Sequence, residues 1–523
     1  MLPKNFKSGM RIFFATVCIS ILTSCTKDLN RLPFVEVTSA TVFNDPASFK
    51  EALAKLYAGL AVSGQQGPAG KPDIAGIDEG FSQYLRQYFQ TEELPTDEAV
   101  IGWSDGTLPE LHRMTWTSSN EFIGAMYSRI YYQISLVNEF LRQTTDDKLK
   151  LYGATDPNIK TYRAEARFLR ALSYSHAIDL FGNVPFATDA NPVGAFLPPQ
   201  ISRTDLFNYV ESELKAIESD LVDPKKNEYG RADKAAAWTL LAKLYLNAQV
   251  YTGTPRFTEC VTYCNKVISG GYALSPNYQN LFLTDNNTSP EIIFPIVFDG
   301  ANIRTWGGMT YLVHAPIGGS MKASDFGVDG GWGGLRTTSA FVSLFKDSID
   351  TRNMFYKNGQ NLEITNISSF SDGYAIAKYK NVSSKGVPGS SLSFPDTDFP
   401  MFRLADVYLM YAEAVLRGGT GGDNATALGY FNQVRQRAYK NTSGNVATLN
   451  LDMILDERGR ELVWEGQRRT DLIRFGKFTG GNYLWAFKGN VPTGKAVEDY
   501  RVLYPIPAAD LIANPTLKQN PGY

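Results

Sequence analysis

Histidine and cysteine are both scarce in this chain of 523 residues. The three histidines, His112, His176 and His314, are far apart, so none lies at zinc-ligand spacing to another. Cys260 and Cys264 lie four residues apart on one expected helix, where regular backbone geometry makes a bridge awkward. We therefore expect two packed thiols, and the sequence favours neither a zinc enzyme nor a fold held by disulfides.

The apolar run near the start of the chain is far too short to span a bilayer. It covers residues 12–22, against the roughly 20 residues that a membrane helix needs, and three basic residues precede it. This order is typical of a secretory signal. Residues 22–25, Leu-Thr-Ser-Cys, then resemble a bacterial lipobox. We expect residues 1–24 to be removed and Cys25 to carry lipid; an ordinary signal peptide that contains a cysteine is the alternative.

Neither sign of charge is in large excess, because the chain contains 51 Lys and Arg residues and 53 Asp and Glu residues. A nucleic-acid partner would need a basic domain or stripe, and none is present. The chain also has no polybasic patch that could hold a membrane surface. Attachment to a membrane therefore depends on the lipid expected on Cys25.

Helical periodicity predicts a mostly α fold. Residues 25–40 are polar and predict a tether, and residues 41–523 predict one domain. Within that domain, the parts 41–280 and 401–523 contain helices in pairs that look like degenerate tetratricopeptide repeats, which bury their apolar faces by stacking. The part 281–400 is rich in Gly, Ser, Asp and Asn, and predicts a large insert of loops and short strands that carries the binding site.

Two further helices have definite predicted bounds. Asp233 is a suitable N-cap for a helix over residues 235–250. A second helix is predicted to run without a break over residues 451–475, with Trp464 inside it.

Three of the seven tryptophans stand among small or polar neighbours, where little in the local sequence can bury them. They are Trp103, Trp306 and Trp332. The other four are interpreted as packing residues, namely Trp116, Trp238, Trp464 and Trp485. Exposed indoles suit the apolar C–H face of a sugar ring, so a glycan site is one interpretation. The other interpretation is that each of the three tryptophans packs at a separate corner of the fold.

Signals for an enzyme are weak. Residues 489–496 nearly match a phosphate-binding loop, but Ala496 replaces the hydroxyl residue that would bind magnesium. No pair of carboxylates is singled out for a glycosidase. Asp396 and Asp398 could hold calcium together with Asp285, although a turn with capping aspartates is the simpler interpretation.

The carboxyl-terminal third contains motifs that resemble the SusD/RagB family of outer-membrane nutrient-binding lipoproteins. In chain order they are RLADVYLMYAEA at 403–414, FNQVRQRA at 431–438, DERGREL at 456–462, EGQRRTDLIRF at 465–475 and YPIP at 504–507. The charged residues among them alternate in sign at helical spacing. We therefore expect an ion-pair lattice and no catalytic role for them.

The resemblance implies a non-catalytic glycan receptor that needs no cofactor. It would be anchored by lipid on the surface of the outer membrane of a Gram-negative bacterium. Its partner would be a TonB-dependent transporter of the SusC type, over which it acts as a lid.

The resemblance is strongest to the starch-binding branch of the family. It assigns Trp103, Trp306 and Trp332 to an aromatic arc, and Asp78 and Arg86 to polar contacts with the sugar. Trp306 replaces a tyrosine of that branch, and Gly106 replaces an amide residue, with Asp105 beside it. A starch-like α-glucan is therefore expected. The alternatives are fructan or another glycan, a surface glycoside hydrolase, and a scaffold that binds only a partner protein.

Overall fold

The structure, a computed structural model, describes residues 46–153, 155–194 and 196–523. The predicted signal segment, Cys25 and nearly all of the predicted tether therefore lie outside the described residues. Among the described residues, no helix combines the length and the apolar character needed to cross a bilayer.

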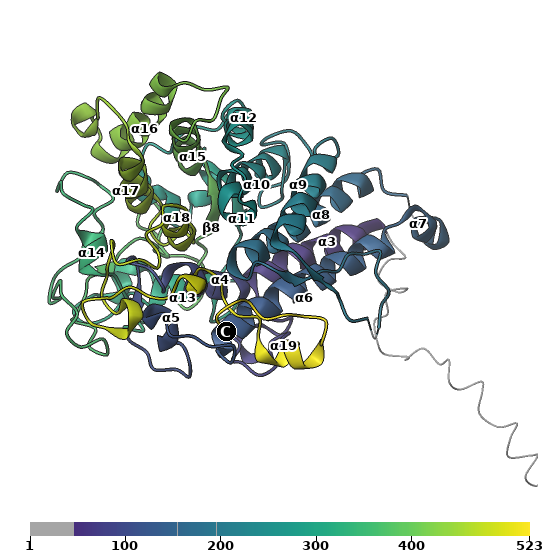
Figure 1. The fold of residues 1–523 in the computed structure, drawn as a ribbon, viewed down its shortest axis with the longest axis horizontal. Helices are drawn as coiled ribbons and strands as arrows, with labels where there is room; N and C mark the ends of the chain where they lie inside the picture. The colour runs from purple at the N-terminus through teal and green to yellow at the C-terminus, as the bar shows by residue number, and fades with distance from the viewer. Residues whose placement is uncertain (1–45, 154, 195) are drawn as a thin grey trace, which may run out of the picture.

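The described part of the chain is mostly helical, as the sequence predicts (Figure 1). The longer helices are α3 (Pro46–Ala61), α6 (Glu121–Gln143), α8 (Ile159–Leu180), α9 (Arg203–Ala216), α10 (Lys234–Leu246), α12 (Phe257–Ile268), α15 (Leu404–Leu416), α16 (Asn424–Tyr439) and α17 (Leu451–Leu462). The shorter helices are α4 (Tyr84–Glu93), α5 (Pro109–Arg113), α7 (Asp146–Tyr152), α11 (Ala248–Thr252), α13 (Gly308–His314), α14 (Ser339–Val342), α18 (Arg468–Arg474) and α19 (Ala508–Ala513).

The strands are short and form antiparallel pairs. The pairs are β1 (Val100–Ile101) with β5 (Leu335–Arg336), β2 (Val184–Pro185) with β3 (Gln200–Ile201), β4 (Ile292–Ile296) with β8 (Phe399–Arg403), and β6 (Phe355–Tyr356) with β7 (Ala375–Ile376). Most strand residues thus lie in or at the edges of the loop-rich part. The β1–β5 pair joins this part to the amino-terminal helices.

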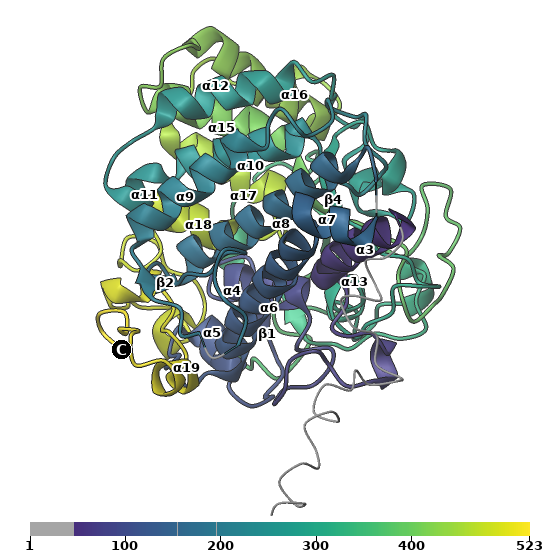
Figure 2. The same ribbon diagram turned by 90° about the vertical axis from the view of Figure 1, so that its right-hand side faces the viewer.

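Helices that lie close in the chain order pack against one another. In Figure 2, α6, α8 and α9 form one stack, and α10, α12, α15 and α16 continue it. Three successive alanines at the start of α10, Ala235, Ala236 and Ala237, are fully buried. Small side chains let neighbouring helix axes approach closely, which is how paired helices bury their apolar faces.

One predicted helix starts as expected but ends at Leu246 and not at residue 250, and a second predicted helix is interrupted. Asp233 caps α10, with its carboxylate accepting a hydrogen bond from the Ala236 amide at 3.0 Å. The unbroken helix predicted over 451–475 is wrong, because α17 ends at Leu462 and α18 starts at Arg468. Trp464 and Gly466 have positive φ angles of 60° and 71°, which no α-helix accommodates. Trp464 is nevertheless fully buried, as a packing residue should be.

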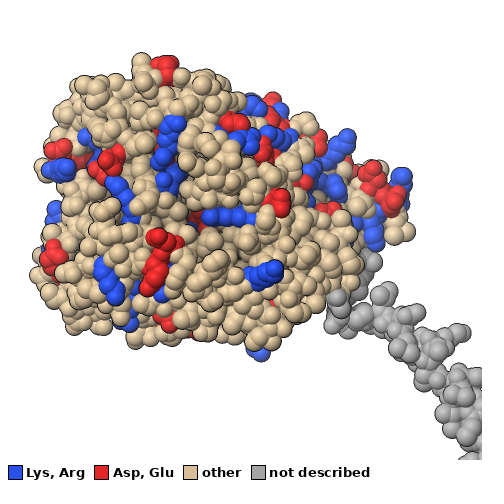
Figure 3. All heavy atoms as spheres, viewed as in Figure 1, with Lys and Arg blue, Asp and Glu red and all other residues tan. Residues whose placement is uncertain are grey.

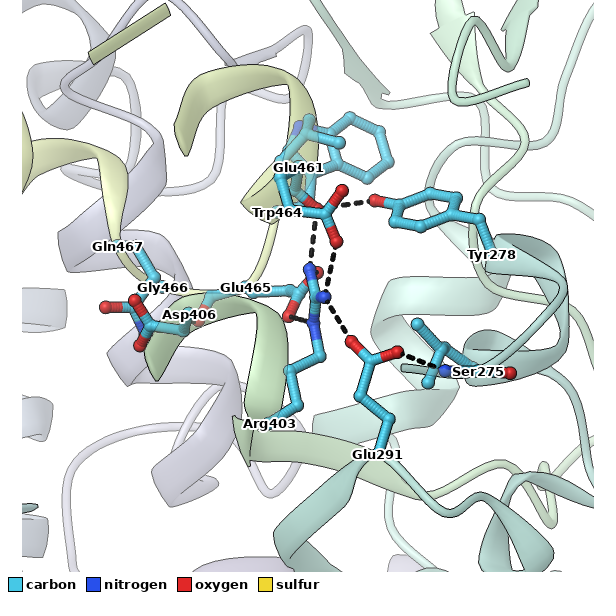
Figure 4. A network of polar contacts seen from close by, with 12 residues as sticks. Ser275, Tyr278, Glu291, Arg403, Asp406, Glu461, Trp464, Glu465, Gly466 and Gln467 are labelled. Atoms are coloured by element: carbon cyan, nitrogen blue, oxygen red, sulfur yellow. Dashed lines mark hydrogen bonds and ion pairs between the residues drawn. The ribbon is translucent and has the colours of Figure 1, made fainter. Parts of the chain in front are cut away.

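A buried lattice of ion pairs surrounds this break (Figure 4). Arg403 lies at its centre and is 1% exposed. Its guanidinium contacts Glu291 at 2.9 Å, Glu461 at 2.6 Å and Glu465 at 2.6 Å. Burial alone would raise the pKa of Glu461, but Arg403 and two further arginines lower it to about 2. The sequence-based expectation of an ion-pair lattice is confirmed.

The lattice continues from the carboxyl-terminal helices into α4. Arg468 makes two hydrogen bonds to the Asp97 carboxylate, at 2.7 and 2.8 Å. Glu93, at the end of α4, accepts hydrogen bonds from the amides of Gly466 at 2.6 Å and Gln467 at 3.1 Å. Because α4 also carries Arg86, these contacts fix the position of a residue that the sequence assigns to the site.

Removing Arg403 should be far more damaging than removing a surface charge. Arg403→Ala leaves three buried carboxylates without their shared partner, so we expect a loss of about 3–5 kcal/mol in the free energy of unfolding. Denaturant titration measures this loss. The control is Lys477→Ala, whose 2.7 Å pair with Asp452 is exposed and should contribute at most about 1 kcal/mol. Equal losses in the two variants would contradict a structural role for the lattice.

Candidate functional site

Trp103, Trp306 and Trp332 converge in the structure, although more than 200 residues separate the first from the other two. The ring centroids of Trp103 and Trp332 lie 6.2 Å apart, and those of Trp332 and Trp306 lie 6.4 Å apart. Neighbouring ring planes are tilted by 47° and 53°. The three indoles therefore form one curved row, called the indole row below, and are not independent corners.

The indole row becomes more exposed toward one end. Trp306 is 40% exposed, whereas Trp103 and Trp332 are half-buried. Phe394 packs against Trp306, with ring centroids 4.9 Å apart. The sequence analysis missed Phe394. A single phenylalanine in a serine-rich loop gives no sign of its partner, and only the fold brings the two rings together.

Glycines beside the tryptophans leave room for the rings themselves. A Cβ atom on Gly334 would lie 2.2 Å from the Trp103 ring, and one on Gly80 would lie 2.8 Å from Trp306 Cβ. The Gly102 amide also donates to the Gly334 carbonyl at 3.0 Å, at the end of the β1–β5 pair. Glycines next to the tryptophans suggested exposed rings in the sequence. In the structure, their missing side chains let the backbone pack closely against the indoles.

Arg86 is buried behind the indole row, and not extended into solvent. It is 4% exposed, and its guanidinium lies over the rings of Tyr311 at 4.4 Å and Trp103 at 5.9 Å. One guanidinium nitrogen donates to the Trp306 carbonyl at 3.3 Å. Arg86 therefore connects the first and last rings of the row. Burial lowers its pKa to about 10, which leaves it charged at neutral pH.

Three carboxylates lie near Arg86, and each raises the pKa of its guanidinium. Asp78 and Asp105 are exposed. The Asp78 carboxylate accepts a hydrogen bond from the Gly80 amide at 2.9 Å, which forms the turn before α4. Glu79 is buried and accepts from the Trp306 amide at 2.9 Å. The structure thus brings together all six residues that the sequence assigned to the site, and it adds Glu79 as a support for Trp306.

His314 supports Trp332 from beneath. The two rings are stacked, with centroids 5.0 Å apart and an interplanar angle of 21°. Its ring nitrogens lie 2.7 Å from the Gly330 carbonyl and 3.2 Å from the Ser393 carbonyl. The histidine therefore lies between the loop that carries Trp332 and the loop that carries Phe394.

The three aspartates proposed for calcium make separate contacts. Asp285 accepts hydrogen bonds from Ser384, Asp396 from the Gly300 amide, and Asp398 from Tyr229. Burial raises the pKa of Asp398 to about 6. Among the described residues, no group of three or more His, Cys, Asp or Glu side chains could hold a metal ion.

The remaining polar and aromatic candidates serve packing. Cys260 and Cys264 are free, buried thiols, as expected. Trp116 and Trp485 are 1% and 2% exposed, while Trp238 is only half-buried. On the face shown in Figure 3, acidic and basic side chains are interspersed, and neither sign dominates.

Gly334→Ala should displace Trp103 and disturb the indole row. The new methyl group would overlap the indole, so we expect a changed near-ultraviolet circular dichroism spectrum with an unchanged far-ultraviolet spectrum. Gly330→Ala is the control, because a Cβ atom there meets nothing within 4 Å. If both variants keep the wild-type near-ultraviolet spectrum, the close Gly334–Trp103 contact is wrong.

His314 should make stability depend on pH. Burial lowers the pKa of His314 more than the two carbonyls and the Asp329 carboxylate raise it, so the folded protein binds this proton less readily than the unfolded chain does. Its contribution to stability is full above about pH 6.5, the ordinary histidine value, and is lost as the pH falls below it. Between pH 7 and pH 5, His314→Gln should therefore lose less unfolding free energy than the wild type. Identical slopes in denaturant titrations would contradict this.

Comparisons with known proteins place the chain in a family. The model of the SusD family matches residues 342–523, and a model described as "Starch-binding associating with outer membrane" matches residues 34–246. Starch-binding protein SusD of Bacteroides thetaiotaomicron is 37% identical, with both chains covered completely. SusD-like protein P2 of Formosa agariphila is 25% identical, and the match covers 97% of this chain and 98% of that protein.

Solved structures show the same fold. A SusD superfamily protein of Parabacteroides distasonis has a TM-score of 0.71 at 23% identity, covering 93% of this chain and all of its own. Surface glycan-binding protein A of Bacteroides thetaiotaomicron, solved in complex with laminarihexaose, has a TM-score of 0.68 at 23% identity, with 91% and 99% covered. On the whole-chain match and the two family models, this chain belongs to the SusD family.

Proposed function

We propose that this protein is a non-catalytic glycan receptor that binds oligosaccharides on the indole row. The observation that carries the proposal is the arrangement of Trp103, Trp332 and Trp306 at successive centroid distances of 6.2 and 6.4 Å. Flat apolar ring faces set at an angle to one another suit a chain of sugar rings that curves. The whole-chain likeness to a protein named as starch-binding supports an α-glucan as the ligand.

Binding of this kind should be weak. Burying about 100 Å² of apolar surface on each indole gives roughly 2.5 kcal/mol before the costs of association. Those costs consume much of the gain, so dissociation constants in the micromolar to millimolar range are expected. A receptor that must pass its ligand on needs such an affinity.

The proposed setting is the outer membrane. The lipobox-like residues 22–25 support lipid attachment at Cys25, and one matching family model is described as associating with the outer membrane. We propose a TonB-dependent transporter of the SusC type as the partner that takes the glycan. The support for this partner is family membership.

The proposed ligand, an α-glucan, has alternatives among other glycans. One structural neighbour was solved with laminarihexaose, and in this chain Trp306 replaces the tyrosine expected of the starch-binding branch. A β-glucan, a fructan or another glycan could occupy the same row. Calorimetric titration with maltoheptaose, laminarihexaose and a fructan distinguishes them; we expect maltoheptaose to bind most tightly.

Loss of one indole should weaken binding without unfolding the protein. We expect Trp332→Ala and Trp306→Ala to reduce affinity for starch in gel retardation by at least about tenfold, since each removes roughly 1.4 kcal/mol or more. Trp238→Ala is the control, a half-buried tryptophan of α10. Unchanged retention in both site variants would contradict the site.

An assay for new reducing ends after incubation with polysaccharide tests the alternative that the protein is a hydrolase. We expect none to appear.

A further inference from the structure

A fourth aromatic ring continues the indole row beyond Trp306. The ring of Phe394 lies with its centroid 4.9 Å from that of Trp306, and the two ring planes are tilted by 49°. The two earlier steps of the row have tilts of 47° and 53°. Four aromatic rings therefore follow one another with nearly the same angle between neighbours. Phe394 is only half-buried, so part of its ring surface faces solvent.

The two ends of this row differ in what supports them. Trp103 and Trp332 pack against the hydrophobic core of the described residues, whereas Trp306 and Phe394 do not. Within the described part of the chain, only Trp306 packs an aromatic ring against Phe394. Burial in the core therefore does not account for Phe394. Two neighbouring aromatic rings outside the core form a continuous apolar surface, which is typical of a binding site.

The loop that carries Phe394 is fixed by a buried amide. Asn381 is fully buried; its side chain donates to the Ser391 carbonyl at 2.7 Å and accepts from the Asp396 amide at 3.0 Å. These contacts lie on both sides of Phe394 in the sequence. The Phe394 amide itself donates to the Ser391 hydroxyl at 3.3 Å. A ring that is already held in place loses little conformational entropy when a ligand binds to it.

The same loop is tied to the loop that carries Trp332. The Asp329 amide donates to the Leu392 carbonyl at 3.1 Å, and the Ser393 hydroxyl donates to the Asp329 carboxylate. The protein itself therefore sets the position of Phe394 relative to the inner rings, without help from a ligand.

We propose that Phe394 is a fourth sugar-binding ring, which extends the site by one sugar unit beyond the three indoles. This inference rests on the proposed function. A phenyl ring has no polar atom, so its contribution is apolar contact with the C–H face of a further sugar. Glycans long enough to reach from Trp103 to Phe394 gain this contact, and shorter ones do not. Phe394 therefore makes the site select for chain length.

Titrations followed by tryptophan fluorescence, with maltotriose and maltoheptaose as the probes, test this proposal. Three sugar units can occupy the indoles alone, whereas seven can also reach Phe394. We expect Phe394→Ala to weaken maltoheptaose binding by about three- to tenfold and to leave maltotriose binding within about twofold of the wild type. Phe394→Tyr keeps the flat ring and should retain both affinities. The matched control is Phe345→Ala, which removes a half-buried phenylalanine that packs against Phe355 at 5.0 Å and should change neither affinity.

Phe394→Leu separates contact with the sugar from support of Trp306. Leucine keeps apolar bulk beside Trp306 but has no flat face, so we expect it to weaken maltoheptaose binding as alanine does. Wild-type affinity in Phe394→Leu, together with a loss in Phe394→Ala, would overturn the proposal, because Phe394 would then only support Trp306. An equal loss for both oligosaccharides in Phe394→Ala would overturn it for the same reason.

Unchanged maltoheptaose binding in Phe394→Ala would also overturn the proposal. In these three cases the wild type still binds maltoheptaose and Trp332→Ala binds it more weakly, so the proposed function stands. A wild type that binds neither oligosaccharide would overturn the α-glucan assignment and this inference together.

Discussion

The position of the indole row depends on how the buried charges around Arg403 are paired. A guanidinium at 1% exposure is costly unless each of its polar atoms has a partner. Arg403 meets this condition with carboxylates from Glu291, Glu461 and Glu465, which come from two distant parts of the sequence. The pairing fixes where the carboxyl-terminal helices stand relative to β4 and β8. A different placement of these helices would leave several buried charges without ion-pair partners.

The constraint reaches the site through α4. One end of this helix is held by the contacts of Glu93 with the backbone of the segment between α17 and α18. Its other end presents Arg86 to the Trp306 carbonyl and to the Trp103 ring. The indole row is therefore positioned by a rigid, charged interior together with the direct contacts of Arg86, Glu79 and His314. Ligands with extended apolar faces can meet the rings while the scaffold remains unchanged.

The sequence predicted the helical fold, the Asp233 cap and the ion-pair lattice, because these follow from local periodicity and charge spacing. It also selected the three tryptophans that converge, since their neighbours could not bury them. The prediction of an unbroken helix over residues 451–475 was wrong, because Trp464 and Gly466 have positive φ angles although the apolar pattern is helical throughout. The sequence analysis also missed Phe394 and the stacking of His314 beneath Trp332. Those contacts join residues far apart in sequence, and no local pattern encodes them.

The separation between a buried charged interior and the exposed end of the indole row has a consequence for how the sequence can change. Trp306 and Phe394 contact each other at the exposed end of the row, whereas the lattice around Arg403 is assembled from other residues. Substitutions at distant, independent sites combine additively in their effects on stability. Selection can therefore exchange the aromatic residues of the exposed end without endangering the fold. Under the proposed function, a different glycan would be accommodated by substitutions at that end of the indole row alone.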